Sequence, residues 1–289
     1  MHPRAFEYVR ASSVSEAVAL LAKRGEDAKI LAGGQSLIPL MKLRLAAPQL
    51  LVDIGRISGL SGIREQGDVL RIGAMTRHRE FEVSAVIRER YPLLADVAKV
   101  LGDPQVRNLG TIGGSLVHAD PAGDWGTALL AFDTKLVAAG PAGVRTLPIN
   151  TFFQDPFTTA LAPSELLTEI RIPKAGLRTG GSYKKLKRKT GDFATVAVSA
   201  QLVLRADGKV ADARLGIGAV APVPFRSPRA EDSLKGKSPS DAAFEEAGRL
   251  ASEDSQPGSD LHGSSDYKRS MVRVLTRRAL EAAAERARR

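Results

Sequence analysis

Ala32-Gly33-Gly34-Gln35-Ser36 and Thr111-Ile112-Gly113-Gly114-Ser115 are two short stretches in which a glycine pair follows an apolar run and precedes a small polar residue. Glycine admits positive φ and leaves open the space of a Cβ, so a ligand can approach the backbone. Successive main-chain N–H groups in such a turn converge on an anion, and the hydroxyls of Ser36 and Ser115 add donors. Either stretch alone is more typical of an ordinary loop turn. Their repetition favours two backbone cradles for a diphosphate.

The composition is that of a soluble globular protein with two or three compact domains. The chain has 289 residues, of which 43% are hydrophobic and 26% are charged, as is usual for folded domains. No run approaches the roughly 20 apolar residues that cross a bilayer, and the first residues lack the apolar region of a signal peptide. We therefore expect no transmembrane segment and a cytoplasmic location, with any contact to the inner face of the membrane made through partners.

Metal and nucleic-acid chemistry are both disfavoured by composition. The chain has no cysteine, which excludes disulfides, thiolate zinc sites and an iron–sulfur cluster held by this chain. Its four histidines form no His-Glu-x-x-His pattern, so we expect no metal site. A net charge of +10 attracts polyanions, but few aromatic residues are available for base stacking. We expect no nucleic-acid partner and keep a basic nucleic-acid-binding module as the less favoured alternative.

Residues 1–55 predict a small β-α-β unit around the first glycine stretch. Ser13 and Glu16 have capping-box spacing and open a helix that Gly25 ends. Short apolar runs predict strands at 29–31 and 50–53. Residues 37–45 predict either a short helix or a loop that covers a ligand.

Residues 56–175 predict a second unit of mixed helices and strands. Gly102-Asp103-Pro104-Gln105 predicts a turn, after which residues 106–109 lead into the second glycine stretch. Residues 173–181 are rich in Gly and Pro and read as a linker, so we place a domain boundary near residue 175, between domains 1–175 and 176–289. Hydrophobic patterns predict helices at 76–81, 93–101 and 128–131 and strands at 69–73, 135–139 and 165–172.

Residues 176–289 predict a C-terminal domain of a three-stranded antiparallel sheet with helices on one face, which makes the whole chain α+β. Strands are expected at 182–189, 194–204 and 210–218, and helices follow to the end of the chain. The run Gly216-Ile217-Gly218-Ala219-Val220-Ala221 matches the letters of a dinucleotide-binding fingerprint. Two prolines follow at once and forbid the helix that this fingerprint requires, so we interpret it as a strand end.

Polar residues after the second glycine stretch have three interpretations. His118, Asp120 and Asp124 could ligate a metal, but three groups without a fourth make a weak site. Asp124 could instead accept backbone N–H bonds at the start of the helix that contains Trp125, which we favour over a metal. In the third interpretation, one of these groups bonds the hydroxyls of a bound nucleotide.

The densest basic run is 183–189. As a strand it would place Lys185, Lys187 and Lys189 on one side and Lys184 and Arg188 on the other. The pattern fits a solvated edge strand protected by lysines and, equally, a strand beside an anionic cofactor or an acidic partner subunit.

With these segments in place, the chain resembles the FAD-binding medium subunits of the molybdenum hydroxylases, most of all those of the carbon monoxide dehydrogenase type. The resemblance covers essentially the whole chain. It implies an FAD domain of the vanillyl-alcohol-oxidase type in two subdomains, about 1–55 and 56–175, followed by the C-terminal domain of the medium subunit. The matching segments are 32–44, 102–108, 110–115, 187–196 and 261–280.

The resemblance also implies which residues contact FAD. The two glycine stretches would line the two sides of the diphosphate, polar residues after the second would lie near the ribityl chain, and a basic residue would lie near the flavin ring. A phenylalanine would gate one face of that ring, and no residue of this chain would act as a catalytic acid or base. The implied contacts are Lys29, Ala32, Gly33, Gly34, Gln35, Ser36, Leu37, Ile38, Leu101, Gly102, Thr111, Gly113, Gly114, Ser115, His118, Asp124, Leu167, Lys184, Asp192 and Phe193.

The implied function is electron transfer within a larger complex. A large molybdopterin-binding subunit would oxidise the substrate, and a small iron–sulfur subunit would carry the electrons to FAD in this chain, in a dimer of heterotrimers. The absence of cysteine fits a subunit that holds no cluster. A stand-alone flavin oxidoreductase of the same fold is the alternative among enzymes.

Overall fold

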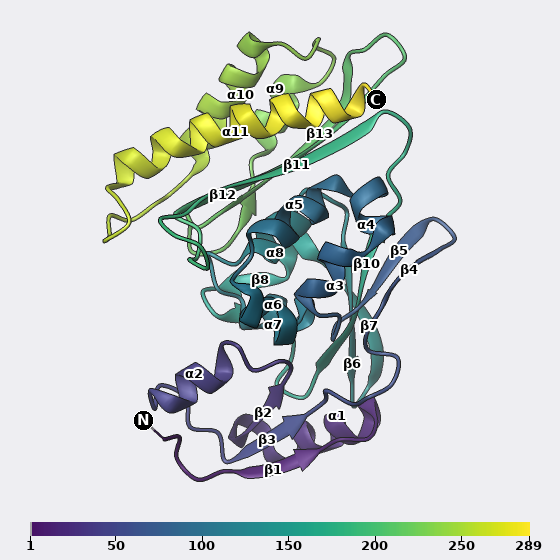
Figure 1. Cartoon of the computed structure of the whole chain (residues 1–289), viewed down its shortest axis with the longest axis vertical. Helices are drawn as coiled ribbons and strands as arrows, with labels where there is room; N and C mark the ends of the chain where they lie inside the picture. The colour runs from purple at the N-terminus through teal and green to yellow at the C-terminus, as the bar shows by residue number, and fades with distance from the viewer. Residues whose placement is uncertain (1) are drawn as a thin grey trace.

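The computed structural model describes residues 2–289 and contains three units that follow one another along the long axis of the molecule (Figure 1). An N-terminal unit lies at one end, a central unit with most of the short helices lies in the middle, and a C-terminal unit lies at the other end. The predicted α+β class is confirmed. No helix within residues 2–289 has the length and apolar character needed to cross a membrane.

The N-terminal unit is a parallel three-stranded sheet in the order β1-β3-β2. Ser13 caps the first helix as predicted, because its hydroxyl accepts from the Glu16 N–H at 3.1 Å. The predicted β-α-β arrangement is confirmed, and the segment at 37–45 contains a short helix. The elements are β1 (Glu7–Arg10), α1 (Val14–Arg24), η1 (Gly25–Asp27), β2 (Ala28–Leu31), α2 (Leu37–Lys42) and β3 (Leu50–Asp53).

The central unit is an antiparallel sheet in the order β4-β5-β10-β6-β7, covered by six short helices. The strands are β4 (Ile63–Gln66), β5 (Val69–Gly73), β6 (Lys135–Gly140), β7 (Gly143–Pro148) and β10 (Leu166–Pro173), with the small pair β8 (Phe153–Asp155) and β9 (Thr158–Thr159) after η2 (Ile149–Thr151). The helices are α3 (His78–Val83), α4 (Ala85–Arg90), α5 (Pro92–Val100), α6 (Pro104–Leu109), α7 (Ile112–His118) and α8 (Asp124–Leu129).

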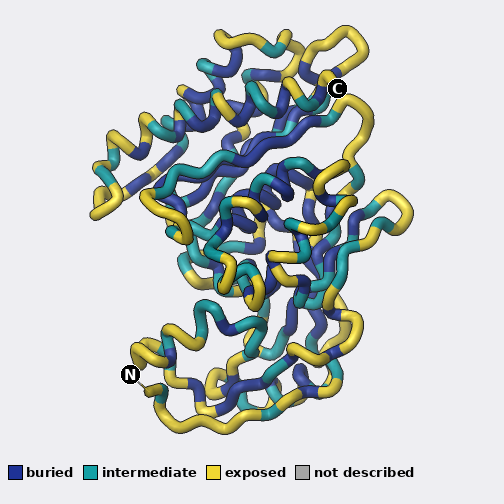
Figure 2. The backbone as a smooth tube through the Cα atoms, viewed as in Figure 1, coloured by how far each residue is buried: buried dark blue, intermediate teal, exposed yellow. Residues whose placement is uncertain are grey.

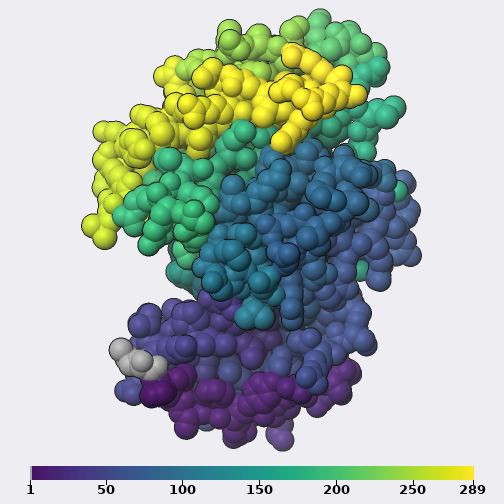
Figure 3. Space-filling model, viewed as in Figure 1, coloured from purple at the N-terminus to yellow at the C-terminus, as the bar shows by residue number. Residues whose placement is uncertain are grey.

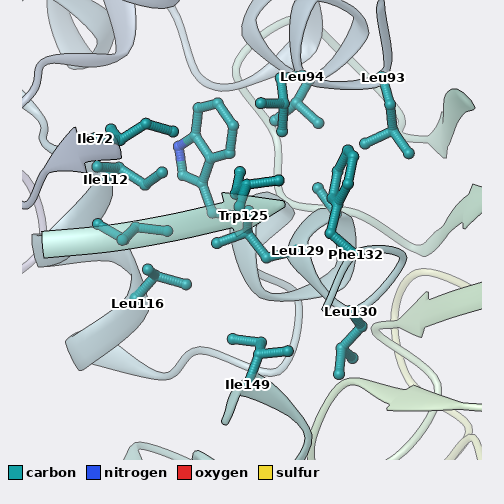
Figure 4. Packing of buried hydrophobic residues seen from close by; sticks show 14 of the residues in the cluster. Ile72, Leu93, Leu94, Ile112, Leu116, Trp125, Leu129, Leu130, Phe132 and Ile149 are labelled. Atoms are coloured by element: carbon teal, nitrogen blue, oxygen red, sulfur yellow. The ribbon is translucent and has the colours of Figure 1, made fainter. Parts of the chain in front are cut away.

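The core of the central unit is built around Trp125. Its indole lies among Ile72, Leu94 and Ile112, which come from β5, α5 and α7 (Figure 4), and it has no exposed surface. Full burial of such side chains stabilises a domain by about 1.5–3 kcal/mol each. The start of α7, next to the second glycine stretch, is therefore held by the largest side chain of the core.

Two predictions for this unit are wrong. Residues 102–105 were predicted to be a turn and 106–109 to connect it to the second glycine stretch, but residues 104–109 form the helix α6. The helix begins here because Asp103 caps it and proline is tolerated at the first helical position. The second glycine stretch forms the first turn of helix α7 and not the predicted turn with converging N–H groups, because Thr111 caps the helix by accepting from the Gly114 N–H at 3.1 Å. Gly113 and Gly114 accordingly do not adopt positive φ.

The C-terminal unit is an antiparallel sheet in the order β11-β12-β13-β14 with three helices on one face. The three predicted strands are present, and a fourth strand of two residues extends the sheet, so the predicted number was one too few. The elements are β11 (Thr179–Leu186), β12 (Val196–Leu204), β13 (Val210–Gly218), β14 (Phe225–Arg226), α9 (Pro228–Leu234), α10 (Asp241–Asp254) and α11 (Ser265–Ala287).

The sheet of the C-terminal unit is buried on both faces, as Figure 2 shows for β11 and β12. One face packs on α11 and the other on the central helices, and glycines make both approaches possible. A Cβ on Gly180 would lie 2.0 Å from the Ala283 carbonyl oxygen, and a Cβ on Gly216 would lie 2.1 Å from that of Thr127. The interpretation of residues 179–181 as linker is therefore wrong, because they begin a buried strand. The boundary near residue 175 stays a prediction.

Candidate functional site

The two glycine stretches, at least 75 positions apart in sequence, lie against each other. The Thr111 hydroxyl donates to the Ala32 carbonyl oxygen at 3.0 Å. A Cβ on Gly33 would lie 2.3 Å from the Leu109 carbonyl oxygen, and a Cβ on Gly114 would lie 2.7 Å from that of Ala32. The N-terminal and central units thus meet at backbone distance here, and the outline of the molecule is indented beside this junction (Figure 3).

The first stretch has the properties of an anion site. Gly33 and Gly34 adopt φ of +91° and +73°, and the Gln35 side chain donates to the Gly33 carbonyl oxygen at 3.1 Å. The four successive main-chain N–H groups of residues 33–36 have no acceptor within residues 2–289. Unsatisfied adjacent donors of this kind bind phosphate groups.

The second stretch differs, because its main-chain donors are already used. The N–H groups of Ile112 and Gly113 donate to the carbonyl oxygens of Thr76 and Ala74, at 3.0 and 2.8 Å, and those of Gly114 and Ser115 donate to Thr111. The interpretation of this stretch as a second nest of free N–H groups is wrong. It contacts Ala32 through the Thr111 hydroxyl and through the close approach of Gly114.

Asp124 lies in a buried polar network and not at a helix cap. Its carboxylate accepts from the Tyr183 hydroxyl at 2.6 Å and from Lys185 Nζ at 2.9 Å, and the side chains of Lys185 and Asp124 are 1% and 7% exposed. Burial raises the pKa of Asp124, and the charge of Lys185 opposes that rise. The expected backbone cap is wrong, since Gly123 caps α8 without a side-chain bond. Within residues 2–289, no three potential ligands cluster for a metal.

Three further implied contacts, His118, Leu167 and Lys184, are half-buried or buried. His118 is half-buried, with its ring centroid 5.2 Å from that of Phe157, and burial lowers its pKa. Leu167 belongs to the core of the central unit and is 3% exposed. Lys184 has no ion pair with any of residues 2–289, and its neighbour Lys185 makes the buried one.

The loop 187–195 lies against the turn before α6. Gly191 adopts φ of +87°, and a Cβ there would lie 3.7 Å from the Asp103 Cβ. Phe193 is 57% exposed. One carboxylate oxygen of Asp192 is buried without a hydrogen-bond partner among the described residues, although Arg188 Nε lies 3.8 Å away from it. An unsatisfied buried acceptor is unusual in a folded protein and fits a ligand that brings donors.

Sequence reasoning missed His78, which lies beside Gly110, the residue before the second glycine stretch. Its ring is 4% exposed, and its Nδ1 accepts from Trp125 Nε1 at 3.0 Å. A Cβ on Gly110 would lie 2.8 Å from His78 Nε2. Burial, and secondarily the charge of Arg107, lowers the pKa of His78 to about 4. No local pattern in the sequence distinguishes this histidine from an exposed one.

Acidification should destabilise the protein through His78. The unfolded imidazole takes up its proton near pH 6.5, whereas the folded one stays neutral to about pH 4. The stability that neutral His78 contributes is therefore lost as the pH falls through this window, by about 3 kcal/mol in total. His78→Asn keeps an acceptor near Nδ1 and cannot titrate, so urea unfolding followed by Trp125 fluorescence should show a smaller loss between about pH 7 and 4. Equal losses for the two proteins would contradict the assignment.

A cavity of about 170 Å³ lies elsewhere, between the central and C-terminal units. Its walls include Phe132, Lys174 and Arg214. No residue of the glycine stretches contributes to it. The junction of the glycine stretches is therefore the better candidate site, because it combines free main-chain donors with positive φ at Gly33 and Gly34.

Comparisons with known proteins identify the family of the chain. The family described as "FAD binding domain in molybdopterin dehydrogenase" matches residues 4–175, and "CO dehydrogenase flavoprotein C-terminal domain" matches residues 181–283. The carbon monoxide dehydrogenase medium chain of Hydrogenophaga pseudoflava is 44% identical over 98% of both chains. A 6-hydroxypseudooxynicotine dehydrogenase complex subunit alpha of Paenarthrobacter nicotinovorans is 37% identical, over 100% of this chain and 97% of its own.

A solved structure shows the same fold. Carbon monoxide dehydrogenase from Hydrogenophaga pseudoflava, in a form that lacks the Mo-pyranopterin moiety of its cofactor, contains a chain that superposes with a TM-score of 0.96. The two chains are 45% identical over 99% of each. The chain therefore belongs to the family of FAD-binding medium subunits of the molybdenum hydroxylases, the family of the carbon monoxide dehydrogenase medium chain.

Proposed function

We propose that this chain binds FAD at the junction of its glycine stretches, accepts electrons from the iron–sulfur clusters of a partner subunit and passes them to an external acceptor. The observation that carries this proposal is the row of four free main-chain N–H groups at residues 33–36. They lie between two units that touch through Ala32 and Thr111. A diphosphate supplies the negative charge that such donors require.

The residues around the junction fit the remaining parts of FAD. The unsatisfied oxygen of Asp192 suits a ring N–H or a hydroxyl group. Ile38, Leu109, Phe157 and Phe193 are exposed to between 36% and 60% and offer apolar surface to flat rings. The chain's own part is to bind and orient the cofactor, and the bound flavin supplies the redox chemistry. We propose the contacts that the family resemblance implies, from Lys29 to Phe193, as the residues that bind FAD.

The proposed partners are a large molybdopterin-binding subunit and a small iron–sulfur subunit in a dimer of heterotrimers. Relatives that match nearly the whole chain are named for carbon monoxide in one case and for 6-hydroxypseudooxynicotine in another. This difference supports substrate recognition on another subunit. We further propose the domains 1–175, with subdomains of about 1–55 and 56–175, and 176–289, and a cytoplasmic location for the complex.

Co-purification tests this function. The affinity-tagged chain, expressed with its genomic neighbours in its own host, should bring down a molybdenum-containing and an iron–sulfur-containing subunit and should carry about one FAD per chain. Reducing the complex with the substrate of its molybdenum-containing subunit should bleach the flavin absorbance. A lone chain that is bleached by a small substrate would favour the stand-alone oxidoreductase. A colourless chain that binds DNA with a steep salt dependence would favour the nucleic-acid alternative.

A further inference from the structure

We propose that Lys187, which the C-terminal unit contributes, positions the turn at residues 100–103 and thereby controls how tightly the protein holds FAD. This inference rests on the proposed function, and it assigns a positioning role to a residue outside the implied FAD contacts. Lys187 acts together with Arg107 of the central unit. The pair, termed here the carbonyl clamp, consists of these two side chains and the three carbonyl groups that they bind.

The carbonyl clamp fixes three successive peptide groups. Lys187 Nζ donates to the Val100 carbonyl oxygen at 3.0 Å, and Arg107 Nη1 donates to those of Leu101 and Gly102 at 3.1 and 3.2 Å. Helix α5 ends at Val100, where carbonyl groups lack helical partners and cations are favourable. Two cations on three adjacent carbonyls leave this turn little freedom to move.

The strand before Lys187 is itself anchored to the central unit. Tyr183 and Lys185 lie on the same side of β11 and both bond Asp124 of α8, and Lys187 follows directly after Leu186, the last residue of this strand. The Tyr183 main-chain N–H also donates to Asp96 of α5 at 3.3 Å. Lys187 therefore follows a strand that is anchored to the central unit, and its bond to Val100 connects the C-terminal sheet to the turn.

The turn is connected rigidly to the first glycine stretch. Asp103 accepts from the Val106 N–H at 2.8 Å and caps α6, a helix of six residues and about 9 Å in length. At its far end the Leu109 carbonyl oxygen occupies the space beside Gly33. A shift of the turn therefore moves Leu109 against the donors at residues 33–36. The C-terminal unit can set the width of the diphosphate site through this helix.

Substitution of Lys187 in the assembled complex tests the clamp. Lys187→Met keeps the apolar stem and removes the donor, and we expect the Kd for FAD, titrated into the deflavinated complex by flavin fluorescence, to rise about tenfold. The thermal midpoint of the deflavinated complex should stay close to that of the wild type. Lys187→Arg restores a donor and should recover most of the affinity. Lys209→Met, at an exposed lysine in the β12–β13 turn, is the matched control and should bind FAD as the wild type does.

The outcomes separate the two proposals. Equal FAD affinity of the wild type and Lys187→Met overturns the clamp alone. A Kd that rises in Lys187→Met and Lys187→Arg alike, together with a matching fall in the thermal midpoint of both deflavinated complexes, also overturns it, because a general packing defect then accounts for the loss. A wild-type complex that takes up no FAD overturns the proposed function and the clamp with it.

Discussion

Gly33→Ala is expected to abolish retention of FAD, with less than about a tenth of the wild-type flavin remaining after gel filtration. The added methyl group would lie 2.3 Å from the Leu109 carbonyl oxygen, 3.1 Å from the Gly110 Cα and in a backbone of φ +91°. Either the first glycine stretch changes its conformation or the N-terminal unit moves away from α6. Both changes spoil the alignment of the donors at residues 33–36.

Gly59→Ala is the matched control for this substitution. Gly59 also adopts positive φ, of +83°, but a Cβ there would have no neighbour within 4 Å. It carries the same kind of backbone strain, about 1 kcal/mol, without the collision. Flavin content, read as the ratio of visible to protein absorbance, should therefore fall only in Gly33→Ala. Equal flavin loss in both variants would show that backbone strain and not the contact between the stretches decides binding.

Among these variants, Lys185→Met is expected to lower the free energy of unfolding most, by about 3–5 kcal/mol. Its thermal midpoint should fall by about 10 °C. The substitution leaves the carboxylate of Asp124, 7% exposed, with the Tyr183 hydroxyl as its remaining bonded partner. Burial already raises the pKa of Asp124, and Lys185 is the main group that opposes the rise. Without Lys185, a buried negative charge must be kept at neutral pH or neutralised by a proton.

The pH dependence and a double variant identify the cause. A group whose pKa is raised on folding contributes stability at low pH that is lost as the pH rises through its folded pKa. The deficit of Lys185→Met should therefore be smaller in acid than at neutral pH. Asp124→Asn combined with Lys185→Met removes both charges and keeps an acceptor for Tyr183, so calorimetry should show most of the stability restored. A double variant as unstable as Lys185→Met would contradict the assignment to an unpaired charge.

The sequence by itself determined the fold class, the order of most elements and the family. These features follow from local patterns: the N-cap at Ser13, the glycine pair at 33–34, and the alternation that puts Tyr183 and Lys185 on one side of β11. Such patterns depend on neighbours three or four positions away at most. For the same reason, helix α6 at residues 104–109 was not predicted, because Asp103 and Pro104 are typical of both turns and helix starts.

Only the tertiary structure decided what the glycines do. Gly33 and Gly114 are required because the two stretches touch each other, and Gly180 is required because α11 crosses β11 at backbone distance. The free donors belong to the first stretch alone, because Thr76, Ala74 and Thr111 satisfy those of the second. Apart from Thr111, which lies three and four positions from Gly114 and Ser115, these partners are 36 to 103 positions apart. Hydrogen bonding and close packing are pairwise properties in space, and a single sequence does not state which pairs meet.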